Sequence, residues 1–144
     1  MQIVDLISVG ISYLLGSFPS AYLIAKIKGV DIIKKVRNGH LGTASTIREV
    51  GKFPGLLVAL TDFSKGAISI MLAETLSGKG WVIILSGIAA IVGHNWSIFL
   101  GFSGGKGAAT TFGDIFYLLP FQLRWKRKIS FSSSLQSTQA SAQS

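Results

Sequence analysis

The chain of 144 residues contains no cysteine, only two histidines and only six acidic residues. The lack of cysteine excludes a disulfide framework and thiolate chemistry. The two histidines and the scattered carboxylates form no cluster with the spacing of metal ligands. We therefore expect neither a metal site nor a cofactor.

Charge of either sign is also scarce. Charged residues make up 14% of the chain and hydrophobic residues 49%, whereas an ordinary soluble domain is about 25% charged. The mean hydropathy is +0.52, which indicates a membrane protein. The net charge is +8, but the basic residues lie mostly between apolar runs, as in the cytoplasmic loops of membrane proteins. This pattern argues against a nucleic-acid partner.

Three apolar runs, at 3–25, 53–73 and 81–100, predict about three membrane spans, since a span needs about 20 apolar residues. A further run, 115–123, is too short to cross a membrane and predicts a partial helix. The sequence thus predicts an all-α, multi-pass transmembrane helical bundle. The first run is interrupted by small residues and a proline, and a broken helix inside a membrane must find polar partners or line a cavity. The interrupting residues are Gly16, Ser17, Pro19 and Ser20.

Basic residues are concentrated in segment 26–52, whereas segment 74–80 contains Lys79 alone. The positive-inside rule places the first segment in the cytoplasm and the second outside. The N-terminus is then outside, and the glycine-rich segment after the third run returns to the cytoplasmic face of the cell membrane. We therefore expect a site at this membrane–water boundary, suited to a substrate that is part lipid and part anion.

The C-terminal part differs in composition. We divide the chain into a membrane domain, 1–123, and a tail, 124–144. The tail begins with a basic cluster around Trp125 and continues as a Ser/Gln-rich stretch that reads as disordered.

Residues 93–113, GHNWSIFLGFSGGKGAATTFG, include a glycine-rich corner that carries Lys106. Glycines allow backbone N–H groups to converge on an anion, and a lysine adds positive charge. The alternative is a flexible turn between two helices. The corner is not a P-loop, because Lys106 is followed by Gly107 rather than by Ser or Thr.

Segment 37–48, RNGHLGTASTIR, also combines glycines, hydroxyls and arginines. Such a loop suits a phosphate, but a solvated basic loop beside anionic lipid headgroups has the same composition.

Asp62 and Lys65 stand three residues apart inside the second apolar run and therefore share one helical face. Ionisable residues inside a membrane usually pair and are functional candidates. A structural ion pair and a substrate contact both fit this spacing. His40 and His94 are candidates either for packing or for catalysis. No GxSxG elbow accompanies them.

Taken together, these motifs resemble the bacterial integral-membrane acyl-phosphate:glycerol-3-phosphate acyltransferase family. GSFPSAYL at 16–23 looks like the family's GSxPxxYL segment, and the 37–48 segment looks like its GSGNxGATNxxR loop. Asp62, Lys65 and Gly66 match its DxxKG. GHNWSIFLGFSGGKGAAT at 93–110 is similar to GHxxPxFxxFxGGKGxAT.

The resemblance implies an enzyme that transfers a fatty acyl group from acyl phosphate to the sn-1 hydroxyl of glycerol 3-phosphate, giving lysophosphatidic acid. It also implies a membrane-lipid environment and leaves the oligomeric state open. The predicted site residues fall into two groups. The predicted catalytic residues are Ser17, Arg48, His94 and Lys106, and the predicted phosphate-binding residues are Gly39, His40, Gly42, Thr43, Ser45, Gly104, Gly105, Gly107 and Thr110.

The sequence departs from the family pattern in several places. Thr43, Ala44 and Ser45 stand where the family has ATN, and Ser97 stands where the family has Pro after its GH segment. Residues 37–40 read RNGH where the family has GSGN, and the family's C-terminal motif with His, Asn and Glu has no counterpart here. We therefore expect a shortened, divergent member. Two alternatives to the enzyme are an inactive member that binds anionic lipid or a partner, and a small membrane transporter subunit.

Overall fold

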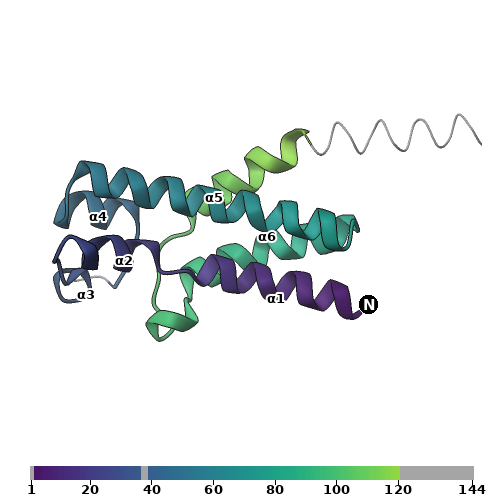
Figure 1. Ribbon diagram of the computed structural model, residues 1–144, viewed down its shortest axis with the longest axis horizontal. Helices are drawn as coiled ribbons and strands as arrows, with labels where there is room; N and C mark the ends of the chain where they lie inside the picture. The colour runs from purple at the N-terminus through teal and green to yellow at the C-terminus, as the bar shows by residue number, and fades with distance from the viewer. Residues whose placement is uncertain (1, 37–38, 121–144) are drawn as a thin grey trace, which may run out of the picture.

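The structure is a computed structural model that describes residues 2–36 and 39–120 (Figure 1). Within these ranges the regular secondary structure is helical, apart from an isolated bridge between Ser97 and Ser103. The all-α prediction is therefore confirmed. The helices are α1 (Ile3–Ser17), α2 (Ser20–Ile27), α3 (Ile32–Lys35), α4 (Thr43–Glu49), α5 (Lys52–Leu76), α6 (Gly80–Asn95), the 3-10 helix η1 (Ile98–Leu100) and a last helix at 108–120.

The bundle is elongated, and α5 runs along its long axis (Figure 1). Helices α1 and α2 follow one another along the long axis, and both pack against α5. Helix α6 lies against α1 and α5, whereas α3 and α4 gather at the α2 end. Two stretches, Ile3–Ile27 and Lys52–Leu76, are long and apolar enough to cross a membrane, and α6 is a shorter apolar helix of 16 residues.

The predicted interruption of the first apolar run is the junction between α1 and α2. Helix α1 ends at Ser17 and α2 begins at Ser20, with Pro19 at its N-cap position. The carbonyls freed at this junction find side-chain donors. The Ser97 hydroxyl donates to the Ser17 carbonyl, and the Lys65 ammonium donates to the Phe18 carbonyl at 3.0 Å. These bonds supply the polar partners that a broken helix in an apolar environment requires.

Small residues bring the helices into close contact. A methyl group on Gly16 would overlap the Ala90 carbonyl, and one on Gly93 would overlap the Tyr13 carbonyl. Helices α1 and α6 therefore meet backbone to backbone. Such packing favours association inside a membrane, where lipid tails are as apolar as the side chains and burial gives little driving force.

Two sequence expectations about local structure were wrong. The last helix begins at 108 rather than at 115, so Thr110 is a helical residue and does not belong to the glycine corner. Ala108 and Ala109 favour helix, and Gly107 makes the turn before them with φ +72°. Segment 26–52, expected as a loop, contains α3 and α4. The tail at 124–144 lies outside the described residues.

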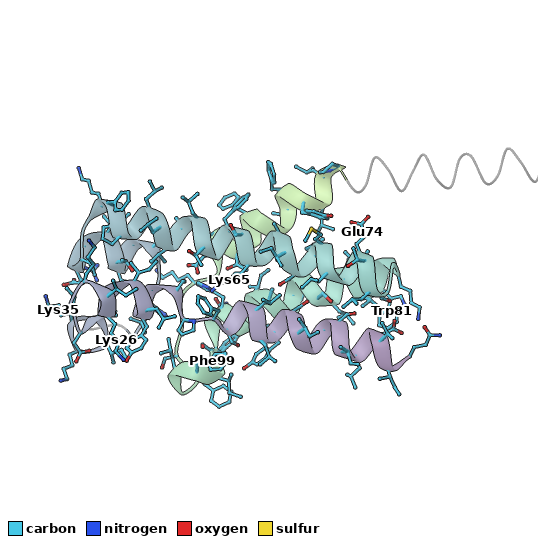
Figure 2. The ribbon with its side chains drawn as sticks, in the orientation of Figure 1. Lys26, Lys35, Lys65, Glu74, Trp81 and Phe99 are labelled. Carbon is cyan, nitrogen blue, oxygen red and sulfur yellow. The ribbon has the colours of Figure 1, made fainter. Side chains whose placement is uncertain are left out.

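The two ends of the bundle differ in their charges. At the α1 end, Asp5 is buried and forms an ion pair of 2.8 Å with Lys79, while Ser77 donates to the same carboxylate at 2.7 Å. At the opposite end, Lys26 and Lys35 extend from the surface of α2 and α3 (Figure 2). The ion pair ties the start of α1 to the α5–α6 link, whereas the lysines leave the α2 end strongly basic.

Candidate active site

A cavity of about 210 Å³ opens where the 39–46 segment and the glycine corner meet α5 and α6. It brings together residues that are far apart in the sequence and that were predicted separately. Most of the predicted phosphate-binding residues lie in its wall. The cavity is lined by His40, Gly42, Thr43, Ala44, Ser45, Asp62, His94, Gly105, Lys106, Gly107, Ala108 and Ala109.

The two glycine-rich segments are bonded to each other. The Leu41 N–H donates to the Gly104 carbonyl at 2.9 Å, and a methyl group on Gly42 would lie 3.8 Å from the Gly105 Cα. The Leu41 side chain is buried in a small apolar cluster with residues of α2, α3 and α5. This cluster anchors the 39–46 segment, so both sides of the cavity rest on the helix bundle.

The glycines of the corner are required mainly by close packing. The Gly105 N–H donates to the His94 carbonyl at 3.1 Å, so it is already bonded within the protein. A methyl group on Gly104 would overlap the same carbonyl, and one on Gly105 would overlap the His94 Nε2 atom. The expected cradle of free N–H groups therefore does not include Gly105. The remaining groups suited to an anion are Lys106 and the first turn of helix 108–120, whose N–H groups have no intrahelical partners.

Lys106 lies at the border between the main cavity and a neighbouring hollow of about 430 Å³. Its side chain is exposed, and no ion pair to Lys106 occurs among the described residues. Gly39 and Gly104 line the neighbouring hollow, and His40 lines both spaces. A lysine in this position can neutralise an anion in either space.

Asp62 is the residue on which the polar contacts of the bundle interior converge. Its Oδ1 atom accepts a bond of 2.6 Å from the Ser20 hydroxyl and lies 2.9 Å from the Lys65 ammonium. The same oxygen lies 3.6 Å from Nδ1 of His94. The predicted pair of Asp62 and Lys65 is therefore an ion pair. Asp62 also lies in the cavity wall, whereas Lys65 lines a separate narrow hollow beside the α1–α2 junction.

Three of the predicted catalytic and phosphate-binding residues line neither the cavity nor the neighbouring hollow. Ser17 is buried at the α1–α2 junction, close to Gly93. Arg48 is on the surface of α4 and pairs with Glu49 at 2.8 Å. Thr110 is buried where helix 108–120 crosses α5.

Sequence reasoning missed the position of Asp62 in the cavity wall and its contact with His94. Its placement inside an apolar run marked Asp62 as a functional candidate, but no local pattern connects it to a histidine on another helix. Ala108 and Ala109 were also missed, because the start of the last helix was predicted too late.

A second basic feature lies outside this cavity. Asp31 precedes α3 and pairs with Lys34 at 3.1 Å. The neighbouring Lys34 ammonium holds the pKa of the Asp31 carboxyl below its usual range. This pair is exposed, and it lines an open hollow of about 540 Å³ together with Tyr22 and Lys26.

The fold is that of an α-helical membrane protein, and its cavity, with Lys106 at the border, lies at the basic end of the bundle. Residues 6–130 match the glycerol-3-phosphate acyltransferase family. The chain belongs to this family.

Relatives and solved structures agree with this assignment. The chain is 41% identical to glycerol-3-phosphate acyltransferase 2 of Moorella thermoacetica, over 83% of this chain and 61% of the relative. It is 39% identical to the glycerol-3-phosphate acyltransferase of Thermus thermophilus, over 92% and 66% of the two chains. The chain thus spans about three fifths of the length of the first of these relatives.

Two crystal structures of PlsY, an integral membrane glycerol 3-phosphate acyltransferase, share the fold. The glycerol 3-phosphate form has a TM-score of 0.74 and 37% identity, covering 92% of this chain and 66% of PlsY. The lysophosphatidic acid form has a TM-score of 0.72 and 40% identity, covering 81% and 57%.

Proposed function

We propose that the chain transfers a fatty acyl group from acyl phosphate to the sn-1 hydroxyl of glycerol 3-phosphate, giving lysophosphatidic acid. The observation that carries this proposal is the cavity that unites Lys106 with the 39–46 segment beside apolar helices. Support comes from the family membership and from the PlsY structures described as glycerol 3-phosphate and lysophosphatidic acid forms.

The proposed reaction needs little covalent help from the protein. Acyl phosphate is a mixed anhydride. The sn-1 oxygen attacks its carbonyl carbon, a new C–O ester bond forms, and the C–O bond to phosphate breaks. The departing phosphate takes the electron pair of that bond and accepts the proton of the hydroxyl. Catalysis then consists mainly of holding two phosphates in line and stabilising their charge.

In this proposal Lys106 neutralises a substrate phosphate, and the first turn of helix 108–120 adds N–H donors. His40 and Thr43 supply further polar groups from the opposite wall. The Ser45 hydroxyl is already engaged, because it donates to the Gly42 carbonyl and accepts from the Gly42 N–H, both at 2.9 Å. Ser45 therefore shapes the wall.

The remaining predicted site residues act in support of the cavity. His94 forms part of its wall. Ser17, Arg48 and Thr110 lie outside it. They can therefore contact a substrate only where the substrate extends beyond the cavity.

We also propose that the protein is a multi-pass protein of the cell membrane, with its N-terminus outside and the cavity at the cytoplasmic face. The distribution of lysines supports this orientation. The cavity end carries the surface lysines of α2 and α3 (Figure 2), whereas Lys79 at the other end is paired with Asp5. Basic residues that remain cytoplasmic set membrane orientation.

The test is an assay of the purified chain in lipid with palmitoyl phosphate and glycerol 3-phosphate, in which lysophosphatidic acid is measured. We expect product from the wild type and a loss of about 100-fold or more in Lys106→Ala, as for removal of one electrostatic stabiliser. Lys35→Ala is the matched control, since Lys35 is exposed at the same end but does not line the cavity. No product from the wild type contradicts the proposal.

A second candidate function rests on the same cavity, since Lys106 at its border can hold an anion with or without a following reaction. In this alternative the chain binds glycerol 3-phosphate or an anionic lipid without turnover. Isothermal titration of glycerol 3-phosphate into the same preparation separates the two, because binding that depends on Lys106 without product formation supports the alternative.

A further inference from the structure

The buried contacts of Asp62 connect three helices to the cavity. Asp62 belongs to α5, Ser20 to α2 and His94 to α6. The hydroxyl of Ser20 and the ammonium of Lys65 both contact Oδ1 of Asp62, at 2.6 and 2.9 Å. The side chains of Asp62 and His94 are 2% and 7% exposed. Ser20, Lys65 and the His94 ring therefore converge on one oxygen of the Asp62 carboxylate.

His94 in turn supports the glycine corner through two parts of the same residue. Its carbonyl accepts the Gly105 N–H at 3.1 Å. Its Nε2 atom lies so close to Gly105 that a methyl group there would overlap it. The residue that follows is Lys106. The His94 ring therefore packs directly against the residue that precedes Lys106.

We propose that Asp62 is a positioning residue for acyl transfer, acting through His94 to hold the corner at 104–107 and thereby Lys106. This inference rests on the proposed function. The ion pair with Lys65 has a second role in the same arrangement. The ion pair keeps the Asp62 carboxylate in place, and the Lys65 ammonium also donates to the Phe18 carbonyl at the α1–α2 junction.

The contact between Asp62 and His94 also favours one tautomer of the imidazole ring. A carboxylate 3.6 Å from Nδ1 favours a hydrogen on that nitrogen, as a partner on one ring nitrogen sets the state of the other. Nε2 then faces Gly105 with its lone pair or, when the ring is protonated, with a second N–H. The side chain of Asp62 thus determines both the angle of the ring and its tautomer.

The first test is a double-mutant cycle between Asp62 and Lys106 in the acyl-transfer assay. We expect Asp62→Asn to lower kcat/KM by about 100-fold, the scale of a misplacement of about 1 Å. We expect Asp62→Glu to recover part of this loss. Lys106→Ala should have a much smaller effect in the Asp62→Asn background than in the wild type, because the lysine is already misplaced. Additive effects overturn the proposal.

The matched control is Asp5→Asn. Asp5 is also a buried aspartate paired with a lysine, but it lies at the opposite end of the bundle. We expect its effect on kcat/KM of the folded protein to be small and additive with that of Lys106→Ala. If Asp62→Asn does not fold, the variant Asp62→Asn/Lys65→Gln removes both charges and keeps a donor for the Phe18 carbonyl.

The second test does not depend on activity. The chain has only two histidines, so uniform 15N labelling gives two pairs of imidazole nitrogen signals together with the Gly105 amide, and His40→Asn identifies the pair that belongs to His94. We expect the wild type to show hydrogen on Nδ1 of His94. The Asp62→Asn/Lys65→Gln variant should shift both ring nitrogens and the Gly105 amide. Unchanged His94 and Gly105 signals overturn the proposal, and an inactive wild type with these shifts contradicts only the proposed function.

Discussion

The Leu41 N–H donates to the Gly104 carbonyl at 2.9 Å, and this bond joins the two glycine-rich segments of the chain. One segment leads into α4 and the other into helix 108–120. The cavity lies directly beside this bond, with residues of both segments in its wall. The two segments therefore form one site, and changes that separate them are expected to affect both stability and activity.

Gly105→Ala tests the close packing of this site. An added methyl group would overlap the His94 Nε2 atom and come within 2.9 Å of the Leu41 carbonyl. We expect the unfolding free energy to fall by about 1–3 kcal/mol, as for overpacking of a filled interior, and acyl transfer to be lost. Thermal unfolding in detergent and the product assay measure the two effects. Gly80→Ala is the control, because a methyl group there meets no atom within 4 Å, and a similar loss in both variants would contradict the prediction.

Gly16→Ala tests the backbone contact between α1 and α6. The methyl group would overlap the Ala90 carbonyl, and the helices would have to separate. We expect a loss of about 1–3 kcal/mol in unfolding free energy. Gly10→Ala, in the same helix, faces open space and should leave the unfolding midpoint unchanged or slightly higher, since alanine favours helix over glycine. Equal midpoints for the two variants would show that the contact does not limit stability.

Asp114→Asn is expected to stabilise the protein. Asp114 is 4% exposed, and neither of its carboxylate oxygens accepts a hydrogen bond from a described residue. It packs close to Gly66 of α5 and Gly87 of α6. Burying an unpaired carboxylate costs free energy that a neutral amide of the same shape avoids in part. We expect the unfolding free energy to rise by about 1 kcal/mol or more.

Asp5→Asn is the contrasting variant for the same unfolding experiment. Asp5 accepts bonds from Lys79 and Ser77, so its replacement removes paired contacts and should lower the unfolding midpoint. Midpoints that move in the same direction for both aspartates would contradict the interpretation of Asp114 as unpaired.

The proposed orientation can be tested with single cysteines, because the chain has none of its own. Lys35 lies at the cavity end of the bundle, and Trp81, the residue after Gly80, lies at the other end (Figure 2). The two variants are Lys35→Cys and Gly80→Cys. In intact cells, a maleimide that does not cross the membrane should label Gly80→Cys and spare Lys35→Cys. Opening the cells should expose Lys35→Cys. The reverse pattern would place the cavity outside.

Part of the site was predictable from sequence because its signals are local. The glycines of the 104–107 corner and the spacing of Asp62 and Lys65 are visible in short segments, and Lys106 was assigned to the site from its motif. The start of helix 108–120 was not predicted, because it directly follows the glycines of the corner and only Ala108 and Ala109 indicate it.

The sequence by itself determined the all-α class, the membrane character and the break in the first apolar run. These follow from hydropathy and from residues such as Pro19, whose backbone preferences act over a few neighbours. Only the tertiary structure decided that Lys65 closes this break, that Gly105 packs on His94, and that Asp62 contacts both Ser20 and His94. Such contacts depend on how α2, α5 and α6 pack together, and helix packing is set by the shapes of surfaces that are far apart in the sequence.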